Sequence, residues 1–140
     1  MTLLPDSARS VIASGHLAHL VTINRDGSPQ VSGVWVGLDG DEIVFASMSD
    51  RQKLRNLRRD PRVAVSIPSG TRNAMGLEEY LVVRGVARIT EGGGAALLQR
   101  LAHNYLGPGV RFPPTPTDAP GFIVRIGVEA VGGVGPWAPQ

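Results

Sequence analysis

Two Asp-Gly dipeptides, at residues 26–27 and 39–40, separate three runs that are rich in β-branched residues. Asp-Gly between such runs is typical of tight hairpin turns, because glycine accepts a positive φ angle at little steric cost. Two of these turns in succession predict an antiparallel meander. Its strands are expected over residues 16–24, 30–38 and 42–48.

The rest of the chain adds three strands and three helices to this meander. Apolar, β-rich runs predict strands over residues 62–68, 80–89 and 122–131, with a bulge or bend at Gly85. Helices are expected over residues 6–14, 51–60 and within 91–105, the second pinned to the sheet by Leu54 and Leu57. Composition predicts loops over 69–76 and 107–120 and an irregular tail over 132–140.

The order of these elements predicts a mainly β fold with flanking helices. Six strands with glycine bends and one interrupting helix favour a small closed or split β-barrel. The chain has no βαβ alternation, so a doubly wound nucleotide-binding sheet is not expected. Its 140 residues, 42% of them hydrophobic, suffice for a single domain with its own core over residues 1–140.

Composition argues against several classes of protein. The absence of cysteine leaves no disulfide or thiolate chemistry, which suits the cytoplasm. No stretch approaches the roughly 20 apolar residues of a membrane span, and residues 1–6 do not have the pattern of a signal peptide. A net charge of +2 is too small to indicate a nucleic-acid partner. We therefore expect a cytoplasmic protein that binds neither membranes nor nucleic acids.

The only lysine of the chain, Lys53, lies in a strongly basic stretch. Six of the 14 basic residues fall within residues 51–62, directly after the strand expected over 42–48. Cations at a helix start oppose the helix dipole, and such a start is better tolerated when an anion binds among them. A solvated basic face is the ordinary alternative. Because the cluster is local, it favours a small anionic ligand.

Histidines and a tail tryptophan are further candidates for functional residues. His16 and His19 would point to opposite faces of a strand, and no cluster has metal-ligand spacing, so no metal site is expected. His103 and Tyr105 could line a substrate pocket, although a half-buried helix histidine is the commoner case. Trp137, in a Gly- and Pro-rich tail, is hard to explain as the core of one chain and favours an interface.

The chain resembles the pyridoxamine-5′-phosphate-oxidase-like split β-barrels over roughly residues 5–131. The resemblance rests on Asp-Gly-Ser-Pro-Gln-Val at 26–31, on the strand with Trp35, and on Ser47 and Lys53 ahead of Arg-Asp-Pro-Arg-Val at 59–63. More narrowly, residues 53–62 are similar to the branch that binds the deazaflavin F420. The resemblance implies a split barrel of the FMN-binding type, present as a homodimer with two flavin-type sites at the subunit interface.

The resemblance also implies which residues bind the cofactor. The turn and helix that grip its phosphate would contain Ser47, Ser49, Arg51 and Lys53. The strand along the edge of its ring system would contain Ser32, Gly33, Val34 and Trp35, although Trp35 is more often a core aromatic. The longer anionic tail would meet Arg55 and Asn56. The other subunit's site would be reached by Tyr80 and Trp137.

The sequence departs from the oxidases of this family in three places. Gln52-Lys53 stands where they carry Arg-Lys, they place an arginine near Ser32, and their lysine for the substrate phosphate would fall near Gly37. Pyridoxamine-phosphate oxidase activity is therefore not expected. The missing arginine near Ser32 favours F420 as the cofactor, with FMN as the alternative.

The function implied is that of an F420H2-dependent reductase, which transfers a hydride to a conjugated, largely apolar small molecule. No side chain stands out as the proton donor, so no catalytic residue is assigned. A non-catalytic F420 or FMN carrier is one alternative, because the binding elements alone would suffice for it. A haem-binding split barrel is another, and its axial ligand would have to be one of His16, His19 and His103.

Overall fold

Within residues 4–115 and 117–139, which the structure (a computed structural model) describes, seven antiparallel strands form one sheet. The strands are β1 (Ala18–Ile23), β2 (Pro29–Val34), β3 (Gly37–Asp39), β4 (Glu42–Ser47), β5 (Arg62–Arg72), β6 (Glu78–Glu91) and β7 (Phe122–Val134). Their order across the sheet is β2-β1-β5-β6-β7-β4-β3. The predicted mainly β fold is confirmed. Residues 1–3, residue 116 of the predicted loop and residue 140 of the predicted tail lie outside the described part.

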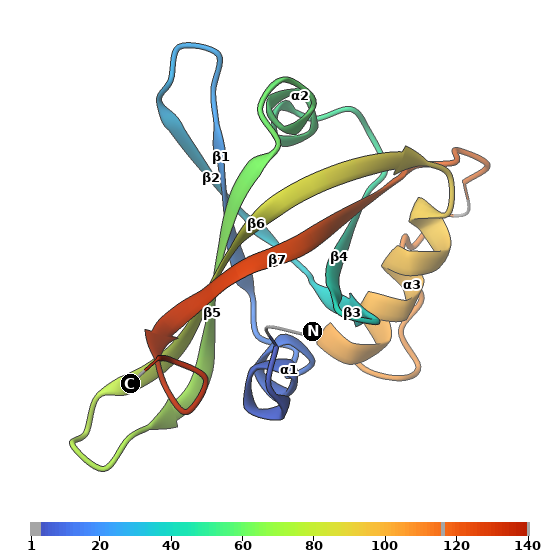
Figure 1. Cartoon of the computed structure of the whole chain (residues 1–140). Coiled ribbons are helices and arrows are strands. Elements are labelled where there is room, and N and C mark those ends of the chain that lie inside the picture. The colour runs from blue at the N-terminus through green and yellow to red at the C-terminus, as the bar shows by residue number, and fades with distance from the viewer. Residues whose placement is uncertain (1–3, 116, 140) are drawn as a thin grey trace.

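The strand expected over residues 30–38 is divided, so the sheet has seven strands where six were predicted. β2 pairs with β1, whereas β3 pairs with β4. Because the chain changes partner at Trp35 and Val36, β2 and β3 follow each other in sequence yet form opposite edges of the sheet. Residues 35–36 thus bridge the two edges of the curled sheet shown in Figure 1.

Three helices, α1 (Asp6–Ile12), α2 (Gln52–Arg59) and α3 (Gly94–Tyr105), lie around the sheet. In Figure 1, α2 lies at the end of the β1–β2 hairpin, α1 lies at the opposite end of β1, and α3 flanks β3 and β4. Leu54 and Leu57 of α2 are buried in the main core, as predicted. None of the helices in the described part is long and apolar enough to cross a membrane.

Strand β7 extends beyond its predicted end at residue 131. Gly132, Gly133 and Val134 pair with β6, so the prediction of irregular backbone is wrong for these residues. Glycine allows this pairing because Gly133 has a φ of 93° and a Cβ there would lie 2.2 Å from a carbonyl oxygen of β6. The irregularity predicted at Gly85 is confirmed as a register shift between Arg84 and Gly85.

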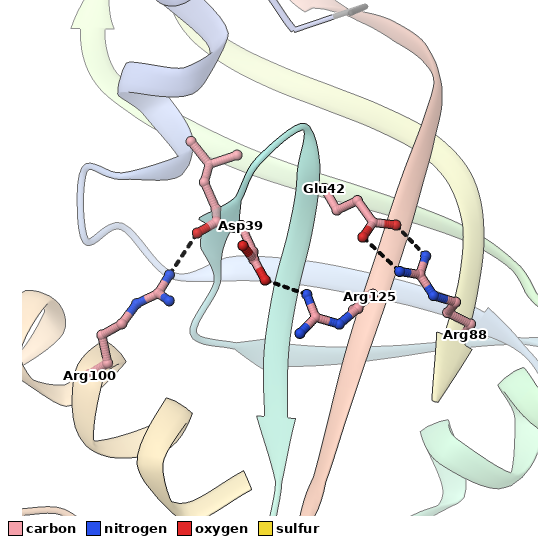
Figure 2. A network of polar contacts seen from close by, with 6 residues as sticks. Asp39, Glu42, Arg88, Arg100 and Arg125 are labelled. Atoms are coloured by element: carbon pink, nitrogen blue, oxygen red, sulfur yellow. Dashed lines mark hydrogen bonds and ion pairs between the residues drawn. The ribbon is translucent and has the colours of Figure 1, made fainter. Parts of the chain in front are cut away.

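Ion pairs attach the β3–β4 turn to its neighbours, as Figure 2 shows. Arg125 of β7 binds Asp39, and Arg88 of β6 binds both carboxylate oxygens of Glu42. Arg100 of α3 donates a hydrogen bond of 2.7 Å to a main-chain carbonyl of β3. Hydrogen bonds from the arginines lower the pKa of Asp39 and of Glu42. An exposed ion pair contributes little to stability by itself, but together these contacts join the β3–β4 hairpin to strands β6 and β7 and to helix α3.

Candidate cofactor site

A pocket of about 230 Å³ lies between the C-terminal end of strand β2, helix α3 and the start of helix α2. Three of the predicted ring-contact residues, Gly33, Val34 and Trp35, line it together with the predicted phosphate ligand Lys53. The other lining residues are apolar: Leu17, Ala46, Leu98, Leu101 and Phe112. Two segments that the sequence analysis assigned to one cofactor therefore lie in the same pocket.

Helix α2 begins with its first backbone N–H groups available to a ligand. Its N-cap residue, Arg51, forms no side-chain cap, and the first turn contains no acidic residue. The N–H groups of Leu54 and Arg55 bond back to the carbonyl of Arg51, whereas those before them have no partner within the helix. An uncapped helix start of this kind suits an anion.

Arg51 and Lys53 differ from the other basic residues of the 51–62 stretch because neither forms a hydrogen bond or ion pair through its side chain with the described residues. The other four are engaged with neighbouring groups: Arg55 with the Asp50 carbonyl and Gln52, Arg58 with the Asp50 carboxylate, Arg59 with the Ile23 carbonyl, and Arg62 with Asp60. Burial lowers the pKa of Lys53, and the charge of Arg51 lowers it further. Two cations near each other in sequence, Arg51 and Lys53, thus have no counter-ion within the part of the chain that the structure describes.

Asn56 ties helix α2 to the β1–β2 hairpin. It is 0% exposed, and its amide nitrogen lies 3.0 Å from Thr22 Oγ1, 2.9 Å from Asn24 Oδ1 and 3.2 Å from Gln30 Oε1. Its amide oxygen accepts a hydrogen bond of 2.7 Å from Gln52. Asn56 was predicted to meet the cofactor tail, but its side chain has no exposed surface to offer a ligand. Asn56 instead fixes the position of helix α2 through these buried hydrogen bonds.

The turn between β4 and α2 is held by a buried serine. The hydroxyl of Ser47 donates to the carbonyl of Ser49 at 2.7 Å, and the same carbonyl accepts the N–H of Arg51 at 3.0 Å. Ser47 therefore shapes the turn, whereas the side chain of Ser49 is exposed and its contact with the phosphate stays a prediction. Arg55 is exposed on the outer side of α2 and bonds to the backbone of Asp50.

Strand β2 presents a bare stretch of backbone to the pocket at Gly33. Alternation along β2 places Val31 and Gly33 on its outer face and Ser32 and Val34 on the other. Ser32, which was predicted to lie along the cofactor ring, is absent from the pocket lining. A Cβ at residue 33 would lie 3.1 Å from the side chain of Leu17. Glycine therefore keeps this wall open to a flat ligand that lies along the backbone.

Three aromatic rings pack together just beyond the C-terminal end of β2, and two of them, Trp35 and Phe112, line the pocket. Trp35 stacks on Tyr105 with ring centroids 5.4 Å apart, and Phe112 packs edge-on against Trp35 at 5.1 Å. The Tyr105 hydroxyl donates to the carbonyl of His16 at 2.9 Å and accepts the N–H of Val36 at 3.1 Å. Burial raises the pKa of Tyr105. Phe112 was not predicted, and its only sequence signal is an aromatic residue within a proline-rich loop.

The two residues predicted to reach a second subunit lie elsewhere. Tyr80 is 42% exposed on β6, opposite Pro68 of β5. Trp137 is 7% exposed and belongs to the main core, so the expectation that one chain could not bury it is wrong. Gly135 makes this burial possible, because a Cβ there would lie 2.2 Å from the Trp137 ring.

The histidines do not join this site. His16, His19 and His103 are all absent from the pocket lining, and His19 and His103 are exposed. Among the described residues, no group of three or more His, Cys, Asp and Glu side chains lies close enough to hold a metal ion.

The sequence profile of the family described as Pyridoxamine 5′-phosphate oxidase matches residues 4–133. The chain therefore belongs to this family, and the resemblance predicted from its sequence is confirmed. Among solved structures, an F420 reductase is 29% identical, with a TM-score of 0.74 over 91% of this chain and 98% of that one. This likeness bears out the narrower resemblance to the F420-binding branch.

Other members of the fold bind different cofactors. A haem-binding protein from Mycobacterium smegmatis is 25% identical, with a TM-score of 0.65 over 90% of this chain and 51% of that one. An FMN-binding protein from Syntrophomonas wolfei is 14% identical, with a TM-score of 0.69 over 95% of this chain and 86% of that one. The latter likeness concerns the fold alone, so cofactor choice has to be argued from the site.

Proposed function

We propose that this protein is an F420H2-dependent reductase of small conjugated molecules. The observation that carries the proposal is the pair of cations at the uncapped start of α2, Arg51 and Lys53, whose side chains have no partner among the described residues. Lys53 lines the same pocket as the bare backbone of Gly33. Membership of the family and the likeness to an F420 reductase support a deazaflavin in this place.

In this proposal, Arg51, Lys53 and the first N–H groups of α2 hold the cofactor phosphate, while residues 33–35 lie along its ring. Reduced F420 supplies the hydride when bound. The protein then contributes orientation, charge neutralisation and exclusion of water. The pocket suits this task, because Lys53 is the only ionisable residue in its lining and the rest is mostly apolar.

A non-catalytic F420 or FMN carrier is the second candidate. The same observation favours it, because the pocket lining contains a lysine suited to a phosphate but no acid–base pair. Turnover separates the two candidates: oxidation of F420H2 that depends on an added acceptor supports the reductase. Tight binding without such oxidation supports the carrier.

A fluorescence titration of the purified protein with oxidised F420, and in parallel with FMN, tests the cofactor. Lys53→Ala is expected to weaken F420 binding about 10- to 100-fold, the effect of losing one charge-assisted hydrogen bond. Arg58→Ala is the matched control, because Arg58 lies on the same helix but pairs with Asp50. Binding of FMN alone would move the protein to the oxidase side of the family. If neither F420 nor FMN bound, the basic stretch over residues 51–62 would be a solvated face without a ligand.

We further propose that the protein is a homodimer whose sites lie at the subunit interface. An outward-facing row of mostly apolar side chains crosses five strands through successive cross-strand pairs: Val31, Val21, Ala64, Arg84 and Ala130. A groove of about 490 Å³ runs along this row, and Val31 is 61% exposed. Gly33 lies on the same outer face of β2 as Val31, so a second copy seated here would border the pocket.

Light scattering coupled to size-exclusion chromatography measures the mass of the protein in solution and so tests the homodimer. We expect twice the mass of one chain for the wild type and the mass of one chain for Ala64→Arg, which places a long cation in the middle of the row. Ala74→Arg, in the exposed loop after β5, is the control and should leave the mass unchanged. A wild-type mass of one chain at micromolar concentration would overturn this assignment.

A further inference from the structure

Gln99 of helix α3 binds the proline-rich loop (residues 107–120) through both the nitrogen and the oxygen of its side-chain amide. Its nitrogen donates to the carbonyl of Val110 at 2.8 Å, and its oxygen accepts the backbone N–H of Phe112 at 2.9 Å. The two bonds satisfy backbone groups as a neighbouring β-strand would. Gln99 is only partly exposed, which shields both bonds from water.

These two bonds are the main attachment of the loop to the rest of the molecule. Among the described residues, no other hydrogen bond joins residues 108–115 to a group outside residues 107–115. The loop position therefore depends on Gln99 and on the packing of Phe112. A single side chain thus controls a segment that would otherwise be held by apolar contact alone.

These two hydrogen bonds, which we call the Gln99 clamp, fix the position of a residue in the pocket wall. Phe112 follows Val110 by two residues and packs against Trp35, and both rings line the pocket that contains Lys53. Trp35 is fixed independently, because it also stacks on Tyr105 of helix α3. Phe112 is therefore the aromatic wall residue whose position is set by the loop.

We propose that Gln99 is a positioning residue that fixes Phe112 and thereby selects flat, conjugated ring molecules as hydride acceptors. Aromatic walls favour flat rings through offset-stacked and edge-to-face contacts, and Leu98 and Leu101 add apolar surface from the same helix. A puckered ring would have to displace Phe112 to enter. The assignment of this acceptor class rests on the proposed reductase function, whereas the clamp itself does not.

Fluorine NMR of protein labelled with 5-fluorotryptophan tests the clamp without any cofactor. The chain has two tryptophans, so two resonances are expected, and Trp35→Phe identifies the one from Trp35. Gln99→Met keeps the length of the side chain but removes both hydrogen bonds, and it should shift the Trp35 resonance while the Trp137 resonance stays in place. Gln99→Glu, which can still accept the N–H of Phe112, should shift it less.

Two further variants serve as a positive and a negative control for the shift of the Trp35 resonance. Phe112→Leu should shift the Trp35 resonance as Gln99→Met does, because it changes the same wall. His103→Gln, at an exposed position on the same helix, should leave both resonances unchanged. An unshifted Trp35 resonance in Gln99→Met would overturn the clamp.

Selection is tested on protein saturated with oxidised F420, by following the Trp35 resonance during titration with menadione, a flat quinone, and with 2-cyclohexen-1-one, a puckered ring. Wild-type protein should bind menadione more tightly, and Gln99→Met should weaken menadione binding about fivefold, as expected for the loss of about one net hydrogen bond. Equal menadione affinity in the two proteins would overturn the role in selection. The F420 titration is separate, so a protein that binds no F420 would refute the reductase and still leave the clamp to be decided by Trp35.

Discussion

Asn56 of helix α2 donates its buried amide to Gln30 of strand β2 at 3.2 Å. This contact joins the helix that starts with the two unpaired cations to the strand that presents bare backbone at Gly33. The two halves of the pocket are thus held at a set separation before any ligand arrives. Preorganisation of this kind removes part of the ordering cost of binding.

Asn56→Ala should therefore weaken both the fold and the site. The substitution removes the amide that donates to Thr22, Asn24 and Gln30, and of these oxygens Gln30 Oε1 retains only a long bond of 3.4 Å from Thr22. We therefore expect a loss of about 1–3 kcal/mol in the free energy of unfolding. Urea unfolding measures this loss. Gln52→Ala, which removes a partner of Asn56 from the exposed surface, is the control and should cost less. Stability equal to wild type in Asn56→Ala would contradict the anchoring role.

Lys53→Met should stabilise the free protein while it weakens anion binding. The pKa of Lys53 lies below its ordinary value of 10.5 because burial and Arg51 disfavour the charged form. The unfolded chain then binds more protons than the fold, so stability rises with pH just below 10.5 and the charge is unfavourable at neutral pH. We expect a higher melting temperature for Lys53→Met at pH 7, with the difference shrinking as the pH rises through this window. A lower melting temperature would show that Lys53 has a stabilising partner.

Gly85→Ala and Gly127→Ala form a matched pair at the β6–β7 bulge. A Cβ on Gly85 would lie 2.1 Å from the carbonyl oxygen of Gly127, which is backbone and cannot move aside. A Cβ on Gly127 would meet its nearest atom, the carbonyl oxygen of Val86, at an ordinary 3.8 Å. We expect Gly85→Ala to destabilise the fold by about 3 kcal/mol or more, as overpacking against rigid structure does. Gly127→Ala should change it by less than about 1 kcal/mol, and equal effects in thermal melts would refute this account of the bulge.

Asp60 should make the stability sensitive to acid. Hydrogen bonds from Arg62 lower its pKa from 3.8 to about 2. Because the folded pKa is depressed, its contribution is fully present above about pH 4 and is lost as the pH falls through about 2. Asp60→Asn should therefore reduce stability at pH 6 but match the wild type near pH 2. Parallel pH profiles of the urea midpoint for the two proteins would rule out this role of Asp60.

The local turns could be predicted from the sequence, whereas the change of strand partner could not. Gly27 and Gly40 have φ values of 87° and 63°, as Asp-Gly hairpin turns require. Alternation along residues 30–38 predicts an extended run but carries no information on which strand it pairs with. The division at Trp35 and Val36 therefore depends on how the whole sheet curls, which brings its two edge strands within two residues of chain.

The candidate site was predicted in the same uneven way. Lys53 could be singled out because a cation at a helix start has a local physical consequence that the sequence displays. Phe112 could not, since its contact with Trp35 depends on where Gln99 holds the loop. Trp137 was assigned to an interface because its tail is rich in glycine, but Gly135 is what lets its ring reach the core. Contacts such as these, between residues that are far apart in the sequence, are set by tertiary structure.

The position of β7 in the sheet has a consequence for how the protein is made. β7 lies between β6 and β4 in the sheet and pairs with both. It therefore connects the β3–β4 hairpin to the β5–β6 hairpin. A nascent chain that has not yet reached residue 122 has no partner for the inner edges of β4 and β6. The apolar strands β4 and β6 therefore each lack a neighbour until residues 122–134 have been synthesised, and an unpaired strand edge of this kind is prone to aggregation.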